Sequence, residues 1–456
     1  MAISPARKIA FDVLQRVEAE GAYASDELHA ALNAGIKAND ARLATELTMG
    51  ALRWRGLLDF LLERDIKKPL VRLDLQVALA LRLGLYQLRF MQRIPAHAAV
   101  HESVELVKRA HKASAASLVN AVLRKAAREV DKRAADFLPQ GMSASGALAI
   151  LHSHPQWLVE RWLARLGETA TVALLKANNC TPRLTCFLND MKAREAVFEE
   201  FSVAHLRIEP GRLLRNAFSV SGGSPSRTRA FRDGAISIQD EASQAVPLLL
   251  AVQPGDRVLD LCAAPGGKTA ILARAAGESG LVLATDFYAH RLRAAKAQFA
   301  RLHLDGIRLV AIDAEKPLPI VEKLGRILVD APCSGTGTLA RHPEIRWRLK
   351  PQQLDVFHRM QVTILQNALA QAAPEGRILY STCSLEPEEN EHVIEEAMKS
   401  GGARRARASE LSGALKPHLV SNLDAAQFFD PTGAFRTSPA KDSTDGFFAA
   451  LLVKEE

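Results

Sequence analysis

The 456-residue sequence lacks the features of a membrane or exported protein. It has no run of 18 apolar residues, the length that a membrane-spanning helix needs. Its first 20 residues carry acidic side chains and lack the apolar core and cleavage site of a signal peptide. These absences predict a cytoplasmic protein that does not enter a membrane.

Cysteine is scarce, and its spacing excludes two kinds of site. The five cysteines form no C-x-x-C pair and no zinc-ligand pattern; they are Cys180, Cys186, Cys262, Cys333 and Cys383. An odd, scattered set of cysteines is typical of a reducing compartment rather than of a disulfide framework. We therefore expect neither disulfides nor a bound metal.

Two nucleotide-binding motifs are also missing. The G-x-G-x-x-G pattern of dinucleotide folds is absent. The segment AAPGGKT, residues 263–269, resembles a phosphate-binding loop, but Cys262 stands where the first glycine would be and Pro265 stiffens the loop. NAD and ATP are therefore disfavoured. Gly266 and Gly267 instead predict a loop whose backbone approaches an adenosyl ligand at a helix N-terminus.

Positive charge is plentiful and unevenly distributed. The formal net charge is +8. Residues 1–140 contain 22 Lys and Arg against 16 Asp and Glu, and residues 204–232 contain six Arg and one acid. Basic clusters are often only a solvated face, but this clustering favours an anionic polymer, most simply a nucleic acid, as partner.

The residue pattern divides the chain into four segments. Residues 1–140 repeat apolar side chains at helical spacing and predict an all-α domain of five to seven helices. Residues 141–153 are predicted to be a linker, and residues 154–235 a small α+β subdomain. Residues 236–456 alternate strands with helices, which predicts a doubly wound, Rossmann-like α/β domain that binds ligands at the carboxyl ends of its strands.

Acidic residues stand at those predicted strand ends. Asp260 and Asp330 end two strands, Asp286 is placed to accept both ribose hydroxyls, and Asp313 could accept from an adenine amine. A single Asp after a strand is commonly a helix N-cap. Acidic residues recur at the ends of several predicted strands, and a glycine loop lies among them. Together these features favour a site for an adenosyl ligand.

Two cysteines end neighbouring predicted strands, in DAPCSGTG (330–337) and STCS (381–384). A thiolate that adds to carbon 6 of cytosine makes carbon 5 nucleophilic enough to attack a sulfonium methyl group. Such a cysteine needs a lowered pKa. Cys383 precedes a predicted helix and Cys333 lies in a strand-to-loop turn, so spacing alone does not rank them.

The motifs DLCAAPGGKT, DAPCSGTG, RHPEIRW and YSTCSLEPEEN, in this order, resemble the RNA 5-methylcytosine methyltransferases of the Sun/NOL/NOP family. NAVLR and IPAHAAVHESVELVKRA resemble the NusB-like domain. The resemblance implies S-adenosylmethionine as cofactor, Cys383 as nucleophile, Cys333 in adduct breakdown and product release, and Asp330 in base or cofactor positioning. The cofactor contacts it implies are Cys262, Ala263, Ala264, Pro265, Gly266, Gly267, Lys268, Asp286, Asp313 and Asp330.

The resemblance also implies a substrate and partners. It points to small-subunit (16S) ribosomal RNA, with tRNA or another RNA as the alternative, and we expect a monomer. It implies an RNA-binding NusB-like domain and an RRM-like subdomain, although the aromatic signature of that module is absent. Gln239 and Asp240 are expected to brace the pocket. Three basic residues are expected to contact the phosphates of the target: Arg341, His342 and Arg346.

Two rival hypotheses come from other functional classes. One is a DNA or small-molecule methyltransferase on the same fold. The resemblance implies that cytosine-5 DNA methyltransferases attack with their Pro-Cys cysteine, so the presence of both cysteines favours an RNA methyltransferase. The other is a NusB-like assembly factor with an inert catalytic domain, which the intact cysteines, glycine loop and acids disfavour.

Overall fold

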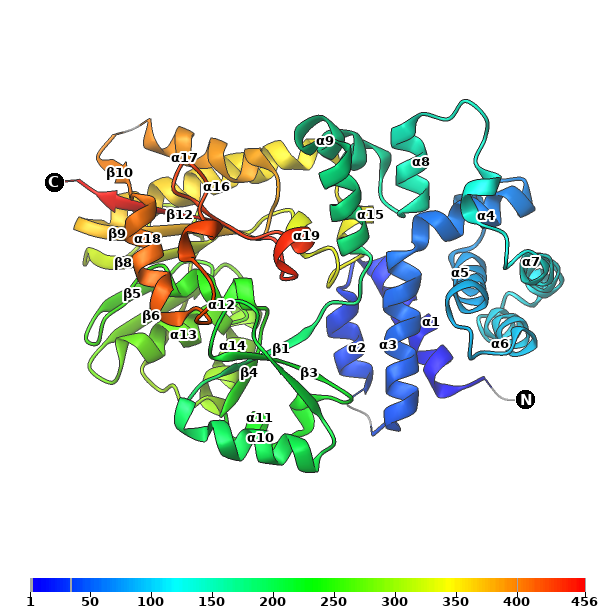
Figure 1. The fold of residues 1–456 in the computed structure, drawn as a ribbon, viewed down its shortest axis with the longest axis horizontal. Coiled ribbons are helices and arrows are strands. Elements are labelled where there is room, and N and C mark those ends of the chain that lie inside the picture. The colour runs from blue at the N-terminus through cyan, green and yellow to red at the C-terminus, as the bar shows by residue number, and fades with distance from the viewer. Residues whose placement is uncertain (1–2, 33–34, 400, 456) are drawn as a thin grey trace. The chain divides into compact units, whose positions relative to one another are not determined.

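The computed structural model describes residues 3–32, 35–399 and 401–455. Contacts divide the chain into two units (Figure 1): residues up to Thr181 together with Leu339–Leu349, and Pro182–Thr338 together with the chain from Lys350 onward. In the described ranges, no helix is long and apolar enough to cross a membrane. Nor do three His, Cys, Asp or Glu side chains gather there as metal ligands.

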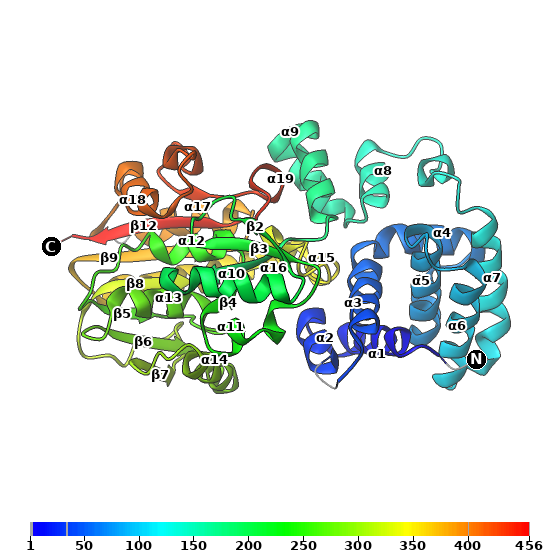
Figure 2. The same ribbon diagram turned by 60° about the horizontal axis from the view of Figure 1, so that its bottom comes forward.

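The first unit is helical, as predicted. Its helices are α1 (Pro5–Glu20), α2 (Ala24–Leu32), α3 (Ala38–Arg53), α4 (Arg55–Ile66), α5 (Leu75–Phe90), α6 (Ala96–Arg109), α7 (Ala116–Arg128), α8 (Ala144–Leu151), α9 (Gln156–Asn178) and the short α15 (Ile345–Arg348). Helix α5 is apolar around most of its circumference, which suits a helix surrounded by others. It packs side by side with α6 and α7 (Figure 2). Gly84 permits this approach, since a Cβ there would meet Leu123 at 2.4 Å.

The predicted linker contains a helix. Residues 141–153 include α8, whose N-cap hydroxyl, from Ser143, accepts the Gly146 N–H at 3.1 Å. The apolar stretch that follows buries Ala149. A serine cap before an apolar run is a helix signal, and it outweighs the low charge on which the linker prediction depended.

The second unit opens with the predicted small α+β subdomain. Its strands are β1 (Leu184–Leu188), β2 (Arg207–Pro210), β3 (Ala217–Ser221) and β4 (Ile236–Ile238), with α10 (Arg194–Val203) and α11 (Arg229–Arg232) between them. The sheet order is β2-β3-β1-β4, and its pairs are antiparallel. Helix α9, within the residues predicted for this subdomain, falls in the first unit when the chain is divided by its contacts.

The rest of the second unit is a doubly wound sheet, as predicted. Its strands are β5 (Arg257–Asp260), β6 (Leu281–Asp286), β7 (Ile307–Ala311), β8 (Leu324–Asp330), β9 (Ala372–Thr382), β10 (Ala403–Arg405), β11 (Phe435–Arg436) and β12 (Phe448–Lys454). The order is β10-β12-β9-β8-β5-β6-β7, with β11 beside β12 (Figure 1). Strands β5 to β9 pair in parallel, and β12 joins β9 antiparallel.

Alternate residues along the strands pack into two hydrophobic cores, one on each face of this sheet. Val258 and Leu328 pack in the core that includes helices α12 (Glu241–Leu248), α13 (Gly267–Ala276) and α18 (Ala408–Leu415). Leu259 and Ile327 pack in the core that includes α16 (Pro351–Gln371) and α17 (Glu391–Met398). Helix α14 (Ala289–Arg301) joins β6 to β7. The strand order reverses between β5 and β8, and such a switch point opens a crevice at the carboxyl ends of both strands.

Candidate functional site

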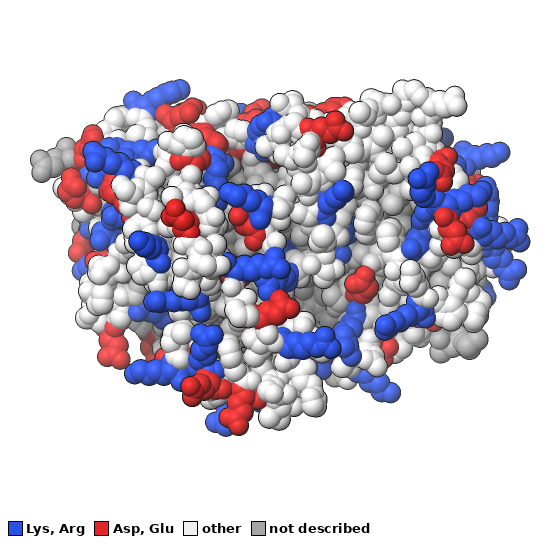
Figure 3. Space-filling view, in the orientation of Figure 1, with Lys and Arg blue, Asp and Glu red and all other residues white. Residues whose placement is uncertain are grey.

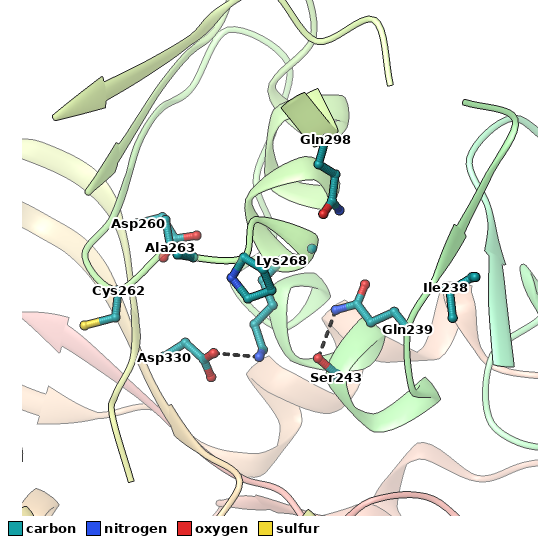
Figure 4. A pocket seen from close by; sticks show the side chains of 12 residues that line it. Ile238, Gln239, Ser243, Asp260, Cys262, Ala263, Lys268, Gln298 and Asp330 are labelled. Carbon is teal, nitrogen blue, oxygen red and sulfur yellow. Dashed lines mark hydrogen bonds and ion pairs between the residues drawn. The ribbon is translucent and has the colours of Figure 1, made fainter. Parts of the chain in front are cut away.

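A cavity of about 150 Å³ lies at the carboxyl ends of β5 and β8 (Figure 4). Its lining contains most of the residues expected to hold a cofactor: Cys262, Ala263, Ala264, Pro265, Gly267, Lys268 and Asp330. Gln239, expected to brace the pocket, also lines it, and its amide donates to the Ser243 hydroxyl at 2.9 Å. Asp240 instead caps α12 by accepting the Ala242 N–H.

The glycine loop has the shape that the sequence predicts. Gly266 has φ +104°, a left-handed conformation that suits glycine, and a Cβ there would meet the Phe299 ring at 2.7 Å. A Cβ on Gly267 would meet the Gln239 amide at 3.2 Å. Helix α13 begins at Gly267, so its free N–H groups and the positive end of its dipole lie at this loop.

An ion pair crosses the cavity. The Lys268 ammonium donates to one oxygen of Asp330 at 2.6 Å, drawn dashed in Figure 4, and the Ser381 hydroxyl donates to the other at 2.8 Å. Burial works against the ammonium, but the Asp330 carboxylate outweighs it and raises the pKa of Lys268, with Cys383 a further contributor. Lys268 is therefore a cation within electrostatic reach of Cys383.

Asp260 is a second acid in the lining, which the sequence analysis placed at a strand end without assigning it a contact. It is 1% exposed, and one oxygen accepts the Thr269 hydroxyl at 2.7 Å. The other oxygen has no partner among the described residues. Burial raises the pKa of Asp260 to about 7.

Asp286 and Asp313 do not line this cavity. One Asp286 oxygen accepts the Tyr288 N–H at 3.0 Å, and the other lies 3.2 Å from Arg291. Asp313 accepts the Glu315 N–H at 3.1 Å. The second Asp286 oxygen also accepts the Ala264 N–H at 3.3 Å, so Asp286 joins the end of β6 to the glycine loop, whereas Asp313 accepts within its own turn.

The two predicted thiols lie together. Cys333 follows β8 and Cys383 follows β9, and these parallel neighbours pair Asp330 with Ser381. The two Sγ atoms are 3.3 Å apart. Gly337 donates its N–H to the Cys383 carbonyl at 2.8 Å, and a Cβ at Gly337 would lie 2.8 Å from the same carbonyl oxygen. The two loops therefore fit against each other with no room for a side chain.

The surroundings of the thiols distinguish them. The hydrogen bond to Cys383, followed by burial and by the charges of Cys383 and Glu389, raises the pKa of Cys333 well above its usual range. Cys333 is thereby held as a neutral S–H, which can donate to the Cys383 sulfur. A neutral thiol is a poor nucleophile.

Sequence comparison gives the family. Residues 247–453 match the family model for the 16S rRNA methyltransferase RsmB/F. Residues 4–128 match the NusB family, and residues 154–225 match the ferredoxin-like domain of RsmF/B-like methyltransferases. The chain is 34% identical to a probable ribosomal RNA small subunit methyltransferase B of Bacillus subtilis, over 98% of both chains. It belongs to the RsmB/F methyltransferase family.

Another relative agrees with this assignment, and solved structures share the fold. The ribosomal RNA small subunit methyltransferase B of Pseudomonas putida is 32% identical over 92% of each chain. The crystal structure of PH0851 has the same fold, with a TM-score of 0.83, 24% identity and full coverage of both chains. A methyltransferase homolog protein from Pyrococcus horikoshii is 26% identical, with a TM-score of 0.57, and covers 69% of this chain and 100% of its own.

In this RsmB/F chain, the residues expected to contact RNA lie in a segment that packs within the first unit. Arg346 is fully buried, and its guanidinium donates to the carbonyls of Ser153, Asn178 and Leu339 at 3.0–3.1 Å. Burial, with Arg53 as a second cause, lowers the pKa of Arg346 to about 9. In this conformation Arg346 is not exposed to a phosphate, because it is buried and both of its terminal nitrogens donate to backbone carbonyls.

Arg341 and His342 precede Arg346 in the same segment, and both are half-buried. Burial lowers the pKa of His342, and its ring lies edge-on to Tyr23 with centroids 6.0 Å apart. Their contact with RNA stays a prediction.

Sequence reasoning missed several functional residues of the RsmB/F site. Ile238, Ser243 and Gln298 line the cavity from segments outside the glycine loop. Asp260 carried a signal, its place at the end of β5. Glu389 carried none: it is fully buried beside both cysteine loops, whereas its neighbour Glu388 is half-buried.

Proposed function

We propose that this member of the RsmB/F family transfers a methyl group from S-adenosylmethionine to carbon 5 of a cytosine in 16S ribosomal RNA, through a covalent adduct of Cys383 with carbon 6. The observation that carries the proposal is the pair of thiols, 3.3 Å apart, beside the acidic cavity. A cytosine-5 mechanism needs one sulfur to attack and a second group to assist release.

The residues of the cavity fit the proposed cofactor. S-adenosylmethionine, when bound, supplies an electrophilic methyl group on a sulfonium. The α13 N-terminus and the glycine loop offer N–H donors and close backbone approach, and the free Asp260 oxygen and Asp330 offer acceptors for a cation. Asp286 and Asp313 stay proposed contacts for the ribose and the adenine.

The charges favour Cys383 as the nucleophile. Lys268 is a half-buried ammonium whose charge interacts with Cys383, whereas Cys333 has the Glu389 carboxylate near it. The Cys383 thiolate adds to carbon 6, which makes carbon 5 electron-rich. After methyl transfer, a base takes the proton from carbon 5, the double bond between carbons 5 and 6 re-forms, and Cys383 leaves carbon 6 as the thiolate. Cys333, held as a thiol, assists this release. Asp330 positions the base or the cofactor through its bonds to Lys268 and Ser381.

Basic side chains supply attraction to the RNA. Helix α7 exposes Arg124, Lys125 and Arg128. Figure 3 shows blue side chains, with a few red ones among them, gathered at the edge where α7 lies. We propose that the NusB-like domain binds RNA with such residues, since charge attracts phosphate without sequence preference. We also propose that the protein acts as a cytoplasmic monomer.

Methyl transfer tests this function directly. Tritiated methyl groups from S-adenosylmethionine should enter unmodified 16S rRNA, and bisulfite sequencing should map them to carbon 5 of a cytosine. Unmodified tRNA is the parallel substrate. Label in tRNA alone would support the alternative RNA substrate, and label at another atom would contradict the proposed chemistry.

A further inference from the structure

A buried carboxylate joins the two cysteine loops. Glu389 belongs to the one-turn helix Pro387–Glu389 between β9 and α17, and it is 0% exposed. One of its oxygens accepts the Ser334 N–H at 2.7 Å and the Gln361 amide at 3.1 Å. The other accepts the hydroxyls of Ser334 and Ser384. Four donors therefore converge on one side chain.

Those two serines are the immediate neighbours of the two thiols. Ser334 follows Cys333 and Ser384 follows Cys383, and the serine hydroxyls lie 3.1 Å apart. Because both hydroxyls donate to the same carboxylate oxygen, the carboxylate determines the separation of the two loops. A displacement of either loop breaks a charge-assisted hydrogen bond in a buried place, where such a bond is strongest.

The backbone around Glu389 is itself held in place. The Tyr380 hydroxyl donates to the Glu389 carbonyl at 2.6 Å. The amide of Asn390 donates to the Ser384 carbonyl at 2.9 Å, and its oxygen accepts the Thr382 hydroxyl at 2.6 Å. The carboxylate is thus anchored to the end of β9, so it transmits the position of that strand to the loop after β8.

The carboxylate also acts on the thiols through its charge. Burial raises the pKa of Glu389, and the bonds from Ser334, Ser384 and Gln361 oppose that shift. Its charge contributes to the raised pKa of Cys333. A negative group beside Cys333 and a positive group, Lys268, within reach of Cys383 separate the roles of two otherwise identical side chains.

We propose that Glu389 is the positioning residue that holds the Cys333 and Cys383 loops in register and keeps Cys333 as the thiol of the pair. This inference rests on the proposed function. Glu389 contacts neither cysteine sulfur. It acts through its hydrogen bonds with Ser334 and Ser384 and through its charge.

The test compares Glu389→Gln with Glu395→Gln. Glutamine keeps the shape and removes the charge, and Glu395 is an exposed carboxylate on the following helix, α17. We expect kcat for methylation of 16S rRNA to fall roughly tenfold or more in Glu389→Gln, with KM for S-adenosylmethionine within about twofold of the parent, because Glu389 does not line the cofactor cavity. Glu395→Gln should match the parent.

A second measurement needs no methyl transfer. Alkylation by iodoacetamide, followed by mass spectrometry, gives the reactivity of Cys333 relative to the exposed Cys180. Removal of the charge should raise this ratio by roughly threefold or more, because thiolate is the reactive form. If kcat and the ratio both match those of Glu395→Gln, the inference is overturned. A parent that alkylates as expected but methylates no RNA would overturn the proposed function instead.

If Glu389→Gln unfolds, the buried Cys186 will become open to alkylation. In that case the variant Ser384→Ala tests the inference. This variant removes one donor to the carboxylate and leaves its charge in place. We expect kcat to fall roughly threefold or more with KM for S-adenosylmethionine retained. An unchanged kcat would overturn the inference.

Discussion

In the proposed mechanism, the charges near the two cysteines give them different roles. Cys333 and Cys383 are the same side chain, and each follows the end of one of two neighbouring strands. Glu389 faces the first, and Lys268 is within reach of the second. Sequence alone placed both cysteines at the ends of neighbouring predicted strands, and such strand ends meet at one edge of a parallel sheet. It did not reveal Glu389, whose partner Ser334 lies 55 positions away along the chain.

Asp260 provides a prediction at the residue scale. Its pKa is raised from 3.8 to about 7 by burial, so the folded state binds a proton that the unfolded state releases. The stability contributed by the protonated acid is complete below pH 4 and is lost as the pH rises through 7. Relative to Asp260→Asn, the parent should therefore lose roughly 2–4 kcal/mol of unfolding free energy between pH 4 and pH 8.

Urea unfolding followed by circular dichroism at several pH values measures this difference. Asp305→Asn, which removes an exposed carboxylate, is the matched control and should follow the parent at every pH. A constant difference between the parent and Asp260→Asn across the range would contradict the buried-acid account.

At the scale of elements, the segment Leu339–Leu349 has a place that sequence patterns did not predict. It follows the Cys333 loop in the chain but packs with the helices of the first unit. The Trp347 indole donates to the Leu52 carbonyl, and Arg348 donates to the carbonyls of Val17 and Gly21. Alternation of strands and helices was enough to predict the sheet. The short basic segment Leu339–Leu349 has no such periodicity. Its packing depends on backbone carbonyls that lie far away in the sequence, so its place could not be predicted from a local pattern.

Arg346→Lys tests that packing. A lysine cannot reach the three backbone carbonyls that the guanidinium bonds, so buried acceptors would lose their donors. We expect the first unit to lose about 3 kcal/mol of unfolding free energy. The four tryptophans, at positions 54, 157, 162 and 347, all lie in this unit, so tryptophan fluorescence during urea unfolding follows it selectively.

The control for this prediction is Arg341→Lys, in the same segment but half-buried. It should shift the fluorescence midpoint much less. Equal midpoints for the parent and Arg346→Lys would show that the carbonyl contacts add nothing to stability.

At the scale of the whole molecule, a helical unit with exposed basic side chains accompanies a unit that contains the chemistry. The sequence predicted both units, because the basic excess of residues 1–140 and the two cysteine motifs lie in different segments of the chain. The boundaries were harder to predict: α9 falls in the first unit by its contacts, whereas the match to the ferredoxin-like domain begins at residue 154 and includes this helix. The central claim remains that Cys383 attacks carbon 6 of the cytosine and that Cys333 assists release of the methylated RNA.

Trapping the covalent intermediate tests that claim most directly. Unmodified 16S rRNA and S-adenosylmethionine are incubated with the parent, Cys333→Ala or Cys383→Ala and resolved on a denaturing gel. Cys333→Ala should accumulate a protein–RNA band, because release is slowed after attack. Cys383→Ala should form no band and transfer no methyl group. A band from Cys383→Ala, with none from Cys333→Ala, would contradict the account by reversing the two roles.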